Sequence, residues 1–356
     1  MNSYKIAVYA GDGIGIEVTR EAVKALKACQ EVFGSFALEF TEFNWGSRYY
    51  RETGKITPPD YLNTLDGFDC ILLGAVGDPA NIPDRIAVVP LIEMRQTFDQ
   101  YIGLRPATLM PGIDSCLEGK EYGDIDIYCV RENSEGEYIN CGGRFKPGTE
   151  DEVAIQTNIH TRKGVERILR YGFGVAAKRG RHLTLATKSN ALRFGMTFWD
   201  DVLEDIKGDY PDITVDKCYI DALCMGLVQK PEFYDTVVAS NMFGDIISDL
   251  AGAVTGSIGL APSGNVNPEK KHPSMFEPVH GSAPDIAGKN IANPIAAIRS
   301  GAMMLDHFGY GDAFRLIEKT VVDTLKERKV LTRDVGGSAS TAEMGDYIAE
   351  RILKAK

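Results

Sequence analysis

The fold is decided by residues 235–250, DTVVASNMFGDIISDL. A short, β-branched apolar run ends at Asn241, and a helix-like pattern begins after it. This order predicts a strand that leads into a helix across a tight turn. Ligand sites in α/β proteins lie at such turns, so the residues after Asn241 are the first candidates for a functional site.

Two acidic residues of the predicted helix are four positions apart. This spacing puts Asp245 and Asp249 on one face, with Cβ atoms roughly 5–6 Å apart. Their like charges repel, whereas a bound Mg²⁺ or Mn²⁺ reverses the sign of the interaction because it prefers hard oxygen ligands. The alternative is a pair of solvated acids that complement the helix dipole, and the neighbouring residues must decide between the two.

Length and composition describe a globular protein with room for two domains or one large doubly wound sheet. The chain has 356 residues, of which 44% are hydrophobic and 25% charged. Its net charge of −11 disfavours nucleic acid and anionic membranes as partners. The sequence has neither a signal-like apolar core nor a span of 18 apolar residues, which predicts a cytoplasmic protein. The seven cysteines show no CxxC spacing, which favours reduced thiols.

Strands and helices are expected to alternate along the chain. A strand over 5–10 and a helix over about 16–32 flank GDGIG at 11–15. This spacing is GxGxG rather than GxGxxG, so it is not a Rossmann signature. Further strands are predicted at 36–44, 68–74, 124–130, 183–187 and 213–219, and helices at 86–101, 164–177, 295–308, 313–327 and 341–354. The pattern indicates an α/β fold with parallel strands.

Two segments lack this regular pattern. Residues 252–292 are rich in Gly, Ala and Pro and show few periodic segments, which is typical of functional loops. Residues 139–161 suit a hairpin that projects from the body, a common way for a protomer to grip a partner.

Three arginines fall at or just after the ends of predicted elements. Arg95, Arg105 and Arg131 would hold a small dianion if they converged, because arginine binds carboxylates through two hydrogen bonds. Each one alone is more often a partner in a surface ion pair.

Three other side chains are candidates for proton transfer or metal binding. Tyr138 is either a proton donor or an interface aromatic residue. Lys188 follows a strand and is either a base or a solvated lysine. Asp221 is either a third metal carboxylate or a helix cap. The combination supplies a metal site, an anion clamp, a base and an acid.

Over essentially its full length, the chain resembles the β-decarboxylating hydroxyacid dehydrogenase family, which includes isocitrate and isopropylmalate dehydrogenases. It is most similar to the tartrate/D-malate dehydrogenase branch. The ordered motifs that carry the resemblance are GDGIG at 11–15, Arg95 with GLRP at 103–106, VRENSEGEY at 130–138, TKSN at 187–190, YID at 219–221, the segment 241–249, and EPVHGSAPDIAGKNIANP at 277–294.

The resemblance implies an isopropylmalate dehydrogenase-like fold of two domains with a mixed, largely parallel sheet. Residues 1–101 and 259–356 would form a discontinuous cofactor-binding domain. Residues 102–258 would form the substrate, metal and dimerisation domain, with an arm at about 139–161.

The resemblance also implies roles for individual residues. The substrate would be bound by Arg95, Arg105, Arg131 and Leu91. Mg²⁺ or Mn²⁺ would be held by Asp245, Asp249 and the Asp221 of a second chain. The Lys188 of that chain would take the hydroxyl proton, and Tyr138 would protonate the enolate after CO₂ leaves. A homodimer follows, because its chains share the site.

The implied cofactor is NAD. The family's adenosine-binding loop corresponds to His280, Gly281, Ser282, Ala283 and Asp285, with Asn293 near the adenine. A carboxylate at Asp285 accepts hydrogen bonds from both ribose hydroxyls and repels a 2′-phosphate, which favours NAD over NADP. A monovalent cation is a further expected cofactor.

The expected reaction is oxidative decarboxylation of a malate-type 2-hydroxy acid, with D-malate (to pyruvate and CO₂) or tartrate favoured. The segment VVPLIEM at 88–94 lacks the Ser/Asn pair that resembles an isocitrate clamp, and Leu91 and Ile92 would suit an isopropyl group. Pro90 fits a first helical turn and would reshape this pocket. The alternatives are a 3-isopropylmalate dehydrogenase, a metal-dependent hydrolase and a binding protein without turnover.

Overall fold

The computed structural model describes residues 2–355. Its strands are β1 (Asn2–Gly11), β2 (Phe36–Glu42), β3 (Cys70–Ala75), β4 (Ile102–Thr108), β5 (Asp126–Glu132), β6 (Gly142–Phe145), β7 (Val153–Gln156), β8 (His182–Thr187), β9 (Thr214–Tyr219), β10 (Thr236–Ala239), β11 (Pro262–Val266) and β12 (Ser274–Pro278). Its α-helices are α1 (Gly15–Phe33), α2 (Ser47–Thr53), α3 (Tyr61–Leu65), α4 (Asp84–Ala87), α5 (Val89–Thr97), α6 (Arg162–Ala177), α7 (Gly195–Ile206), α8 (Ile220–Gln229), α9 (Asn241–Val254), α10 (Ile295–Phe308), α11 (Gly311–Glu327) and α12 (Thr341–Leu353).

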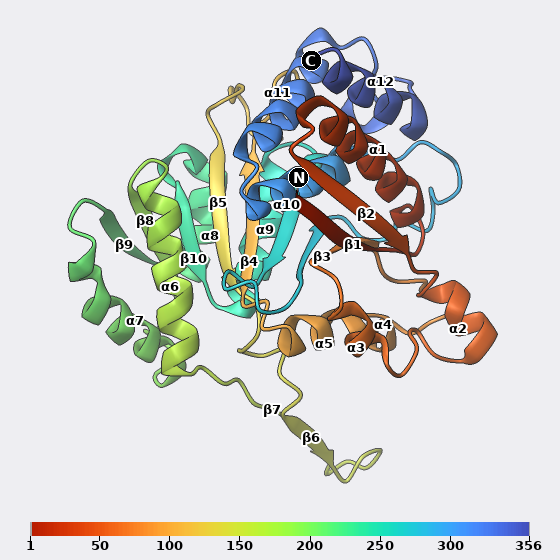
Figure 1. Ribbon diagram of the computed structural model, residues 1–356. Helices are drawn as coiled ribbons and strands as arrows, with labels where there is room; N and C mark the ends of the chain where they lie inside the picture. Colours follow the sequence, from red (N-terminus) through yellow and green to blue (C-terminus); the bar gives the residue numbers. More distant parts are fainter. Residues whose placement is uncertain (1, 356) are drawn as a thin grey trace.

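One sheet of ten strands runs through the described part of the chain, in the order β2-β1-β3-β12-β11-β4-β5-β10-β8-β9 (Figure 1). Both ends of the sheet are parallel. The centre, from β12 through β11 and β4 to β5, is antiparallel. The predicted α/β fold with a mixed, largely parallel sheet is therefore confirmed.

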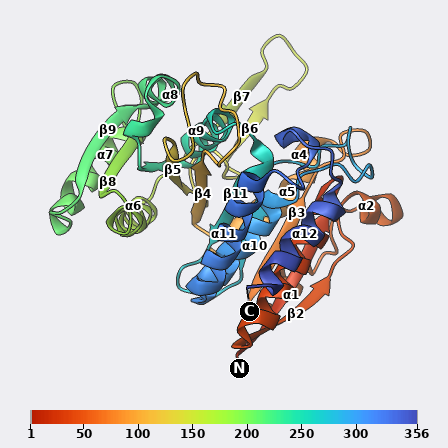
Figure 2. The same ribbon diagram turned by 90° about the horizontal axis from the view of Figure 1, so that it is seen from above.

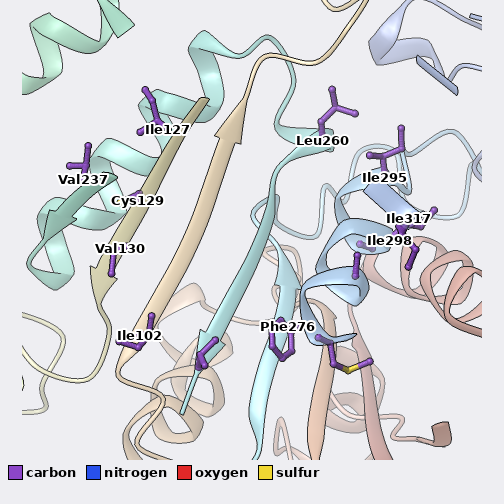
Figure 3. Close-up of a cluster of buried hydrophobic side chains, with 14 of the residues drawn as sticks. Ile102, Ile127, Cys129, Val130, Val237, Leu260, Phe276, Ile295, Ile298 and Ile317 are labelled. Atoms are coloured by element: carbon purple, nitrogen blue, oxygen red, sulfur yellow. The ribbon is translucent and has the colours of Figure 1, made fainter. Parts of the chain in front are cut away.

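Helices cover the two halves of the sheet differently (Figure 2). In the first half, α1 and α10 pack on the strands, and α11 and α12 pack against these helices. The second half carries α6 on one face and α9 on the other. Side chains such as Ile102, Val130 and Phe276 fill the core along the central strands (Figure 3). Burial of this apolar surface is the main stabilising contribution.

Local sequence explains where several helices begin and end. The helix α1 stops at Gly34, whose φ of 61° is left-handed and costs glycine little. The Thr161 hydroxyl caps α6 by accepting from the Gly164 N–H at 3.0 Å. Ser340 and Glu343 form a reciprocal capping box at the start of α12.

The single helix predicted over 86–101 is wrong. The chain forms two short helices there, α4 and α5, and Pro90 occupies the first turn of α5. Proline lacks an N–H and cannot continue a preceding helix, which explains the interruption. The helical path ends at Phe98, and Asp99 takes a positive φ of 45° before β4 starts.

The expectation of few regular elements over 252–292 is also wrong. This segment holds β11 and β12, whose residues are all buried at the centre of the sheet. The sequence PSGNV of β11 has low intrinsic strand propensity, so pairing with β12 and β4 decides its conformation. The helices α2 and α3 and the strand β4 were likewise not predicted.

The hairpin expected near residues 139–161 is present as the antiparallel pair β6 and β7. It projects away from the body of the molecule, and all eight of its strand residues are exposed (Figure 1). We call residues 139–161 the arm. The division into domains at residues 101 and 259 stays a prediction.

Two further expectations concern the whole chain. All seven cysteines are free, as the absence of paired spacings predicted. Among the helices of residues 2–355, none combines the length and the apolar character that crossing a bilayer requires.

Candidate functional site

The carboxylate of Asp245 is the centre of the predicted site. It lies on the second turn of α9, directly above the end of β5 in the sheet. One oxygen, Oδ1, accepts from Arg105 at 3.2 Å and forms a very short contact with Arg131. The other, Oδ2, accepts from the Tyr138 hydroxyl at 2.9 Å. Three side chains from two other segments of the chain therefore meet at this carboxylate.

The charges around Asp245 set its protonation. Burial raises the pKa of Asp245, but the guanidinium groups of Arg131 and Arg105 outweigh burial, so that the pKa is lowered overall. The pKa of Asp249 shifts in the opposite direction and is raised overall. Burial raises its pKa, Arg105 opposes this shift, and the charge of Asp245 adds to it.

Arg131 is held by Asn241 and Tyr138 as well as by Asp245. Its Nε and one terminal nitrogen donate to Asn241 Oδ1 at 3.0 and 2.7 Å. The Tyr138 ring centroid lies 5.4 Å from the guanidinium carbon. Burial and the charges of Arg105 and Arg95 lower the pKa of Arg131 to about 10. These repulsions show that the three arginines are close enough to act on one anion.

Arg95 is the member of the cluster that comes from the helix α5, in the other half of the molecule. It donates to Glu277 Oε1 at 3.1 Å, and this oxygen also accepts from Asn265 at 2.7 Å. Its Nε is buried and has no hydrogen-bond partner among the described residues. Burial lowers the pKa of Arg95, Glu277 opposes the shift, and Arg105 adds to it. A free donor on a buried guanidinium is an unused site for a ligand oxygen.

Lys188 and Asp221 form a second group. The Lys188 ammonium makes a very short contact with Asp221 Oδ1, and this hydrogen bond is the main reason that the pKa of Asp221 is lowered. Lys188 also lies 5.8 Å from the Tyr219 ring centroid. Within residues 2–355, no three His, Cys, Asp or Glu side chains are grouped to hold a metal. One chain therefore does not bring Asp221 together with Asp245 and Asp249.

The predicted cofactor loop packs against the glycine-rich turn after β1. The N–H of Ile14 donates to the Ser282 carbonyl at 2.8 Å. Gly13 has a φ of 56°, and a Cβ there would lie only 2.0 Å from the same carbonyl oxygen, so glycine is required. The two glycine-rich segments that stand apart in the sequence thus form one surface.

The remaining loop residues have distinct surroundings. His280 Nε2 is buried without a hydrogen-bond partner in the described chain, and burial lowers the pKa of this imidazole. Asn293 donates to Asp334 at 3.0 Å and accepts from the Ile295 N–H. Gly281 and Asp285 are exposed, whereas Ala283 is half-buried with a φ of 39°. The orphaned imidazole nitrogen and the exposed carboxylate fit a nucleotide that offers hydroxyl groups.

Leu91 is half-buried and packs against the cluster formed by Trp45, Tyr61 and Met94. It lies one helical turn before Arg95 on α5, so both residues belong to the same helix face. Contact of Leu91 with a substrate stays a prediction.

Sequence reasoning missed several residues that support the site. Asn241 and Glu277 hold two of the arginines, and Ser248 accepts from Arg105 at 2.8 Å. The buried Asp12 carboxylate accepts from the backbone N–H groups of Ser47 at 2.6 Å and Gly77 at 2.9 Å, which fixes the turn after β1. All four lie in or beside the quoted motifs, and that position was the only available signal.

Comparison with known proteins assigns the class. Residues 5–348 match the isocitrate/isopropylmalate dehydrogenase family, and the chain belongs to this family. The fold described above is also found in a solved structure of this family. The chain is similar to the isocitrate dehydrogenase structure of Methylococcus capsulatus, with a TM-score of 0.87 and 34% identity over 98% of this chain and 99% of that one. The predicted isopropylmalate dehydrogenase-like fold is thus confirmed.

Two curated relatives show which activities within the family this chain is similar to. The D-malate dehydrogenase (decarboxylating) of Escherichia coli is 50% identical over 99% of this chain and 100% of that protein. The tartrate dehydrogenase/decarboxylase of Pseudomonas putida is 46% identical over 99% of each chain. The protein is therefore a decarboxylating hydroxyacid dehydrogenase, an oxidoreductase of the malate and tartrate type.

Proposed function

We propose that this protein oxidises D-malate and decarboxylates it to pyruvate and CO₂, with NAD and Mg²⁺ or Mn²⁺, and that tartrate is a further substrate. The observation that carries the proposal is the convergence of Arg95, Arg105 and Arg131 around Asp245. Three guanidinium groups in one cluster suit a small dianion with two carboxylates. The names of the most similar curated relatives support the same choice of substrate.

The side chains present fit a divalent cation. Asp245 and Asp249 offer hard oxygen ligands on one helix face. Burial, and after it the charge of Asp245, raise the pKa of Asp249, and a bound cation would stabilise the charged form of this carboxylate. In the bound state, the cation would polarise the oxygen on the reacting carbon, and NAD would accept the hydride. Asp221 of a second copy would supply the third carboxylate, and a monovalent cation stays a further expected cofactor.

The chain's own residues supply binding and proton transfer. The arginines orient the carboxylates and exclude other orientations of the substrate. Tyr138 holds its proton firmly, because burial and the charge of Asp245 raise the pKa of its phenol. The phenol therefore stays protonated, and we assign Tyr138 as the group that would give a proton to the carbon that loses CO₂. Lys188 of a second copy would take the hydroxyl proton at Nζ, which makes a homodimer part of the proposal.

The choice of NAD rests on Asp285. This carboxylate is exposed, and no hydrogen bond joins its side chain to another described residue. It is available to accept from the two ribose hydroxyls, and its charge repels a 2′-phosphate.

A second candidate substrate, 3-isopropylmalate, is favoured by apolar side chains near Arg95. Val88 and Val89 are exposed at the start of α5, and Leu91 follows on the helix face of Arg95. These residues would contact a branched alkyl group on the malate skeleton.

A spectrophotometric panel tests the proposal. Purified protein with Mn²⁺ is mixed with D-malate, the tartrate isomers, 3-isopropylmalate or isocitrate, each with NAD or NADP. We expect the highest kcat/KM with D-malate and NAD, equal amounts of NADH and pyruvate, and no turnover after EDTA treatment. L-malate is the matched control. A higher kcat/KM for 3-isopropylmalate would select the second candidate, and hydrolysis without NADH would indicate a metal-dependent hydrolase.

A further inference from the structure

A pocket lies at the outer edge of the sheet, away from the candidate active site, between α1 and the segment that follows β2. Its volume is about 340 Å³. The floor is formed by Val8 and Ala10 near the end of β1, and one wall by residues 42–48. We call it the edge pocket. None of the predicted catalytic, substrate, metal or cofactor residues lines it.

The edge pocket is basic in a protein whose net charge is −11. Arg20, Lys24, Lys27 and Arg48 line it, against one carboxylate, that of Glu42. Arg20, Lys24 and Lys27 follow one another along the same side of α1, at spacings of four and three residues. A concave surface lined by one sign of charge concentrates its field and attracts ions of the opposite sign.

Ion pairs with neighbouring carboxylates engage two of the cations at the pocket. Lys24 contacts Glu21 at 2.7 Å and Asp346 at 2.6 Å, and Arg48 lies 3.6 Å from Glu52. These pairs tie up two of the four cations. Arg20 and Lys27 are both exposed along α1, and the Lys27 ammonium lies 5.7 Å from the Phe40 ring centroid.

The wall formed by residues 42–48 carries two aromatic rings. The rings of Phe43 and Trp45 have centroids 4.3 Å apart with an angle of 30° between their planes. Tyr9 supports Trp45 from below in a T-shaped contact at 5.6 Å. The rings are thereby fixed in place, so a flat apolar ligand would lose little free energy to reorganisation of the wall.

We propose that the edge pocket binds a small aromatic anion, in which a carboxylate or phosphate is attached to a flat apolar ring. The ring would lie against Phe43 and Trp45, and the anionic group would face Arg20 and Lys27. The pocket lies beside the carboxyl ends of the parallel strands β1 and β2. This site is independent of the proposed malate chemistry.

Tryptophan fluorescence provides the test, because the chain has only two tryptophans. Trp199 is buried in α7, so Trp199→Phe leaves Trp45 as the sole reporter. Phenyl phosphate and benzoate are titrated separately, which distinguishes the two anionic groups, and benzamide is the neutral control. We expect saturable quenching by at least one anion and roughly tenfold weaker binding of benzamide.

Charge-reversed variants link the signal to the pocket. Arg20→Glu with Lys27→Glu should weaken binding of the anion roughly tenfold or more. The matched control, Arg315→Glu with Lys319→Glu on α11, makes the same change in net charge and should bind as the parent does. If Trp199→Phe does not fold, the same quenching is sought in the unmodified chain and must vanish in Trp45→Phe. The proposal is overturned if neither anion gives a saturable signal, or if both charge-reversed variants bind equally.

Discussion

Arg131 has 1% of its surface exposed, and its neighbours explain how the fold accommodates a buried guanidinium. Asn241 accepts two of its hydrogen bonds, and Asp245 balances its charge. Removal of the acidic partner of a buried cation is costly because the remaining charge stays desolvated. Asp245 therefore serves two purposes in this account, as a structural counter-ion and as a metal ligand.

The variant Asp245→Asn tests whether this carboxylate holds the metal ion. The amide keeps the shape of the side chain but loses the charge that would hold a divalent cation. We expect turnover with D-malate and Mn²⁺ to fall on the order of 100-fold, with NAD affinity nearly unchanged. Steady-state rates and a titration of NAD binding measure the two effects. Unchanged rates would remove Asp245 from the metal site.

Because Asp245 is also the counter-ion of Arg131, the same variant should lose stability in a pH-dependent way. The pKa of Asp245 is lowered in the folded protein, so its contribution to stability is present above the pKa of an unfolded aspartate and is lost as the pH falls through the folded value. Because the side chain is 36% exposed, solvent screening limits the expected effect to about 1 kcal/mol. Urea unfolding with EDTA at pH 7 and at pH 3.5 should show a smaller difference at the lower pH. A constant difference would contradict the ion-pair explanation.

The proposed preference for NAD also depends on one residue. Asp285→Lys replaces a charge that repels a 2′-phosphate with one that attracts it. We expect the ratio of kcat/KM for NADP to that for NAD to rise roughly tenfold or more. Lys289→Asp, four positions along the same loop, is the control for a general change of charge. An unaltered ratio in Asp285→Lys would show that the adenosine lies elsewhere.

Among single residues, the sequence allowed prediction of several side chains that meet at the candidate site, but not of the residues that hold them in place. Arg131 and Tyr138 lie in one motif, and their chemistry is visible in the residue types. Asn241, Glu277 and Asn265 act through contacts between distant segments, and nothing in their local pattern indicates these partners. Tertiary neighbours, rather than local sequence, define such roles.

Among the elements, β11 and the arm illustrate what can and cannot be predicted locally. The strand β11 is formed by residues of low strand propensity and is recognised only once its buried neighbours are known. The arm was expected from two glycines and an alternating stretch, and it forms the hairpin of β6 and β7. Long amphipathic segments such as α1 and α10 were predicted nearly to their ends because their periodicity is a local property.

The arm leads to a prediction about assembly. Phe145 and Ile155 are 65% and 62% exposed on the hairpin, and large apolar side chains seldom stay exposed on an isolated hairpin. We expect Phe145→Lys with Ile155→Lys to shift the protein from dimer to monomer, as seen by light scattering after gel filtration. Glu150→Lys, in the loop at the tip, should leave the dimer intact. A dimer that persists in the double variant would exclude the arm from the interface.

In the whole molecule, two parallel halves are joined through an antiparallel centre of β12, β11, β4 and β5. The first and last parts of the chain lie together in one half, as Figure 2 shows. The arginine cluster lies where the halves meet, since Arg95 comes from α5 and Arg131 from β5. A ligand held by both arginines would therefore couple the two halves, which is a common arrangement for sites between lobes.

The arrangement within one chain is consistent with the proposal that the site is shared between two chains. Lys188 and Asp221 form a pair of their own, and no metal-binding group in residues 2–355 unites Asp221 with Asp245. In a homodimer with twofold symmetry, the pair from each chain would meet the cluster of the other. Sequence alone suggested this sharing only through the family resemblance, because no local pattern reports on a second copy.

The most direct test mixes two inactive variants. Lys188→Met and Asp245→Asn are each purified, unfolded together and refolded as a mixture, with each variant refolded alone as the control. If the sites are shared, a mixed dimer has one intact site, and random pairing restores about a quarter of the parent's D-malate-dependent NADH formation. If tagged mixed dimers form and show no activity above the controls, Lys188 and Asp245 act within one chain, and the account of a shared site is contradicted.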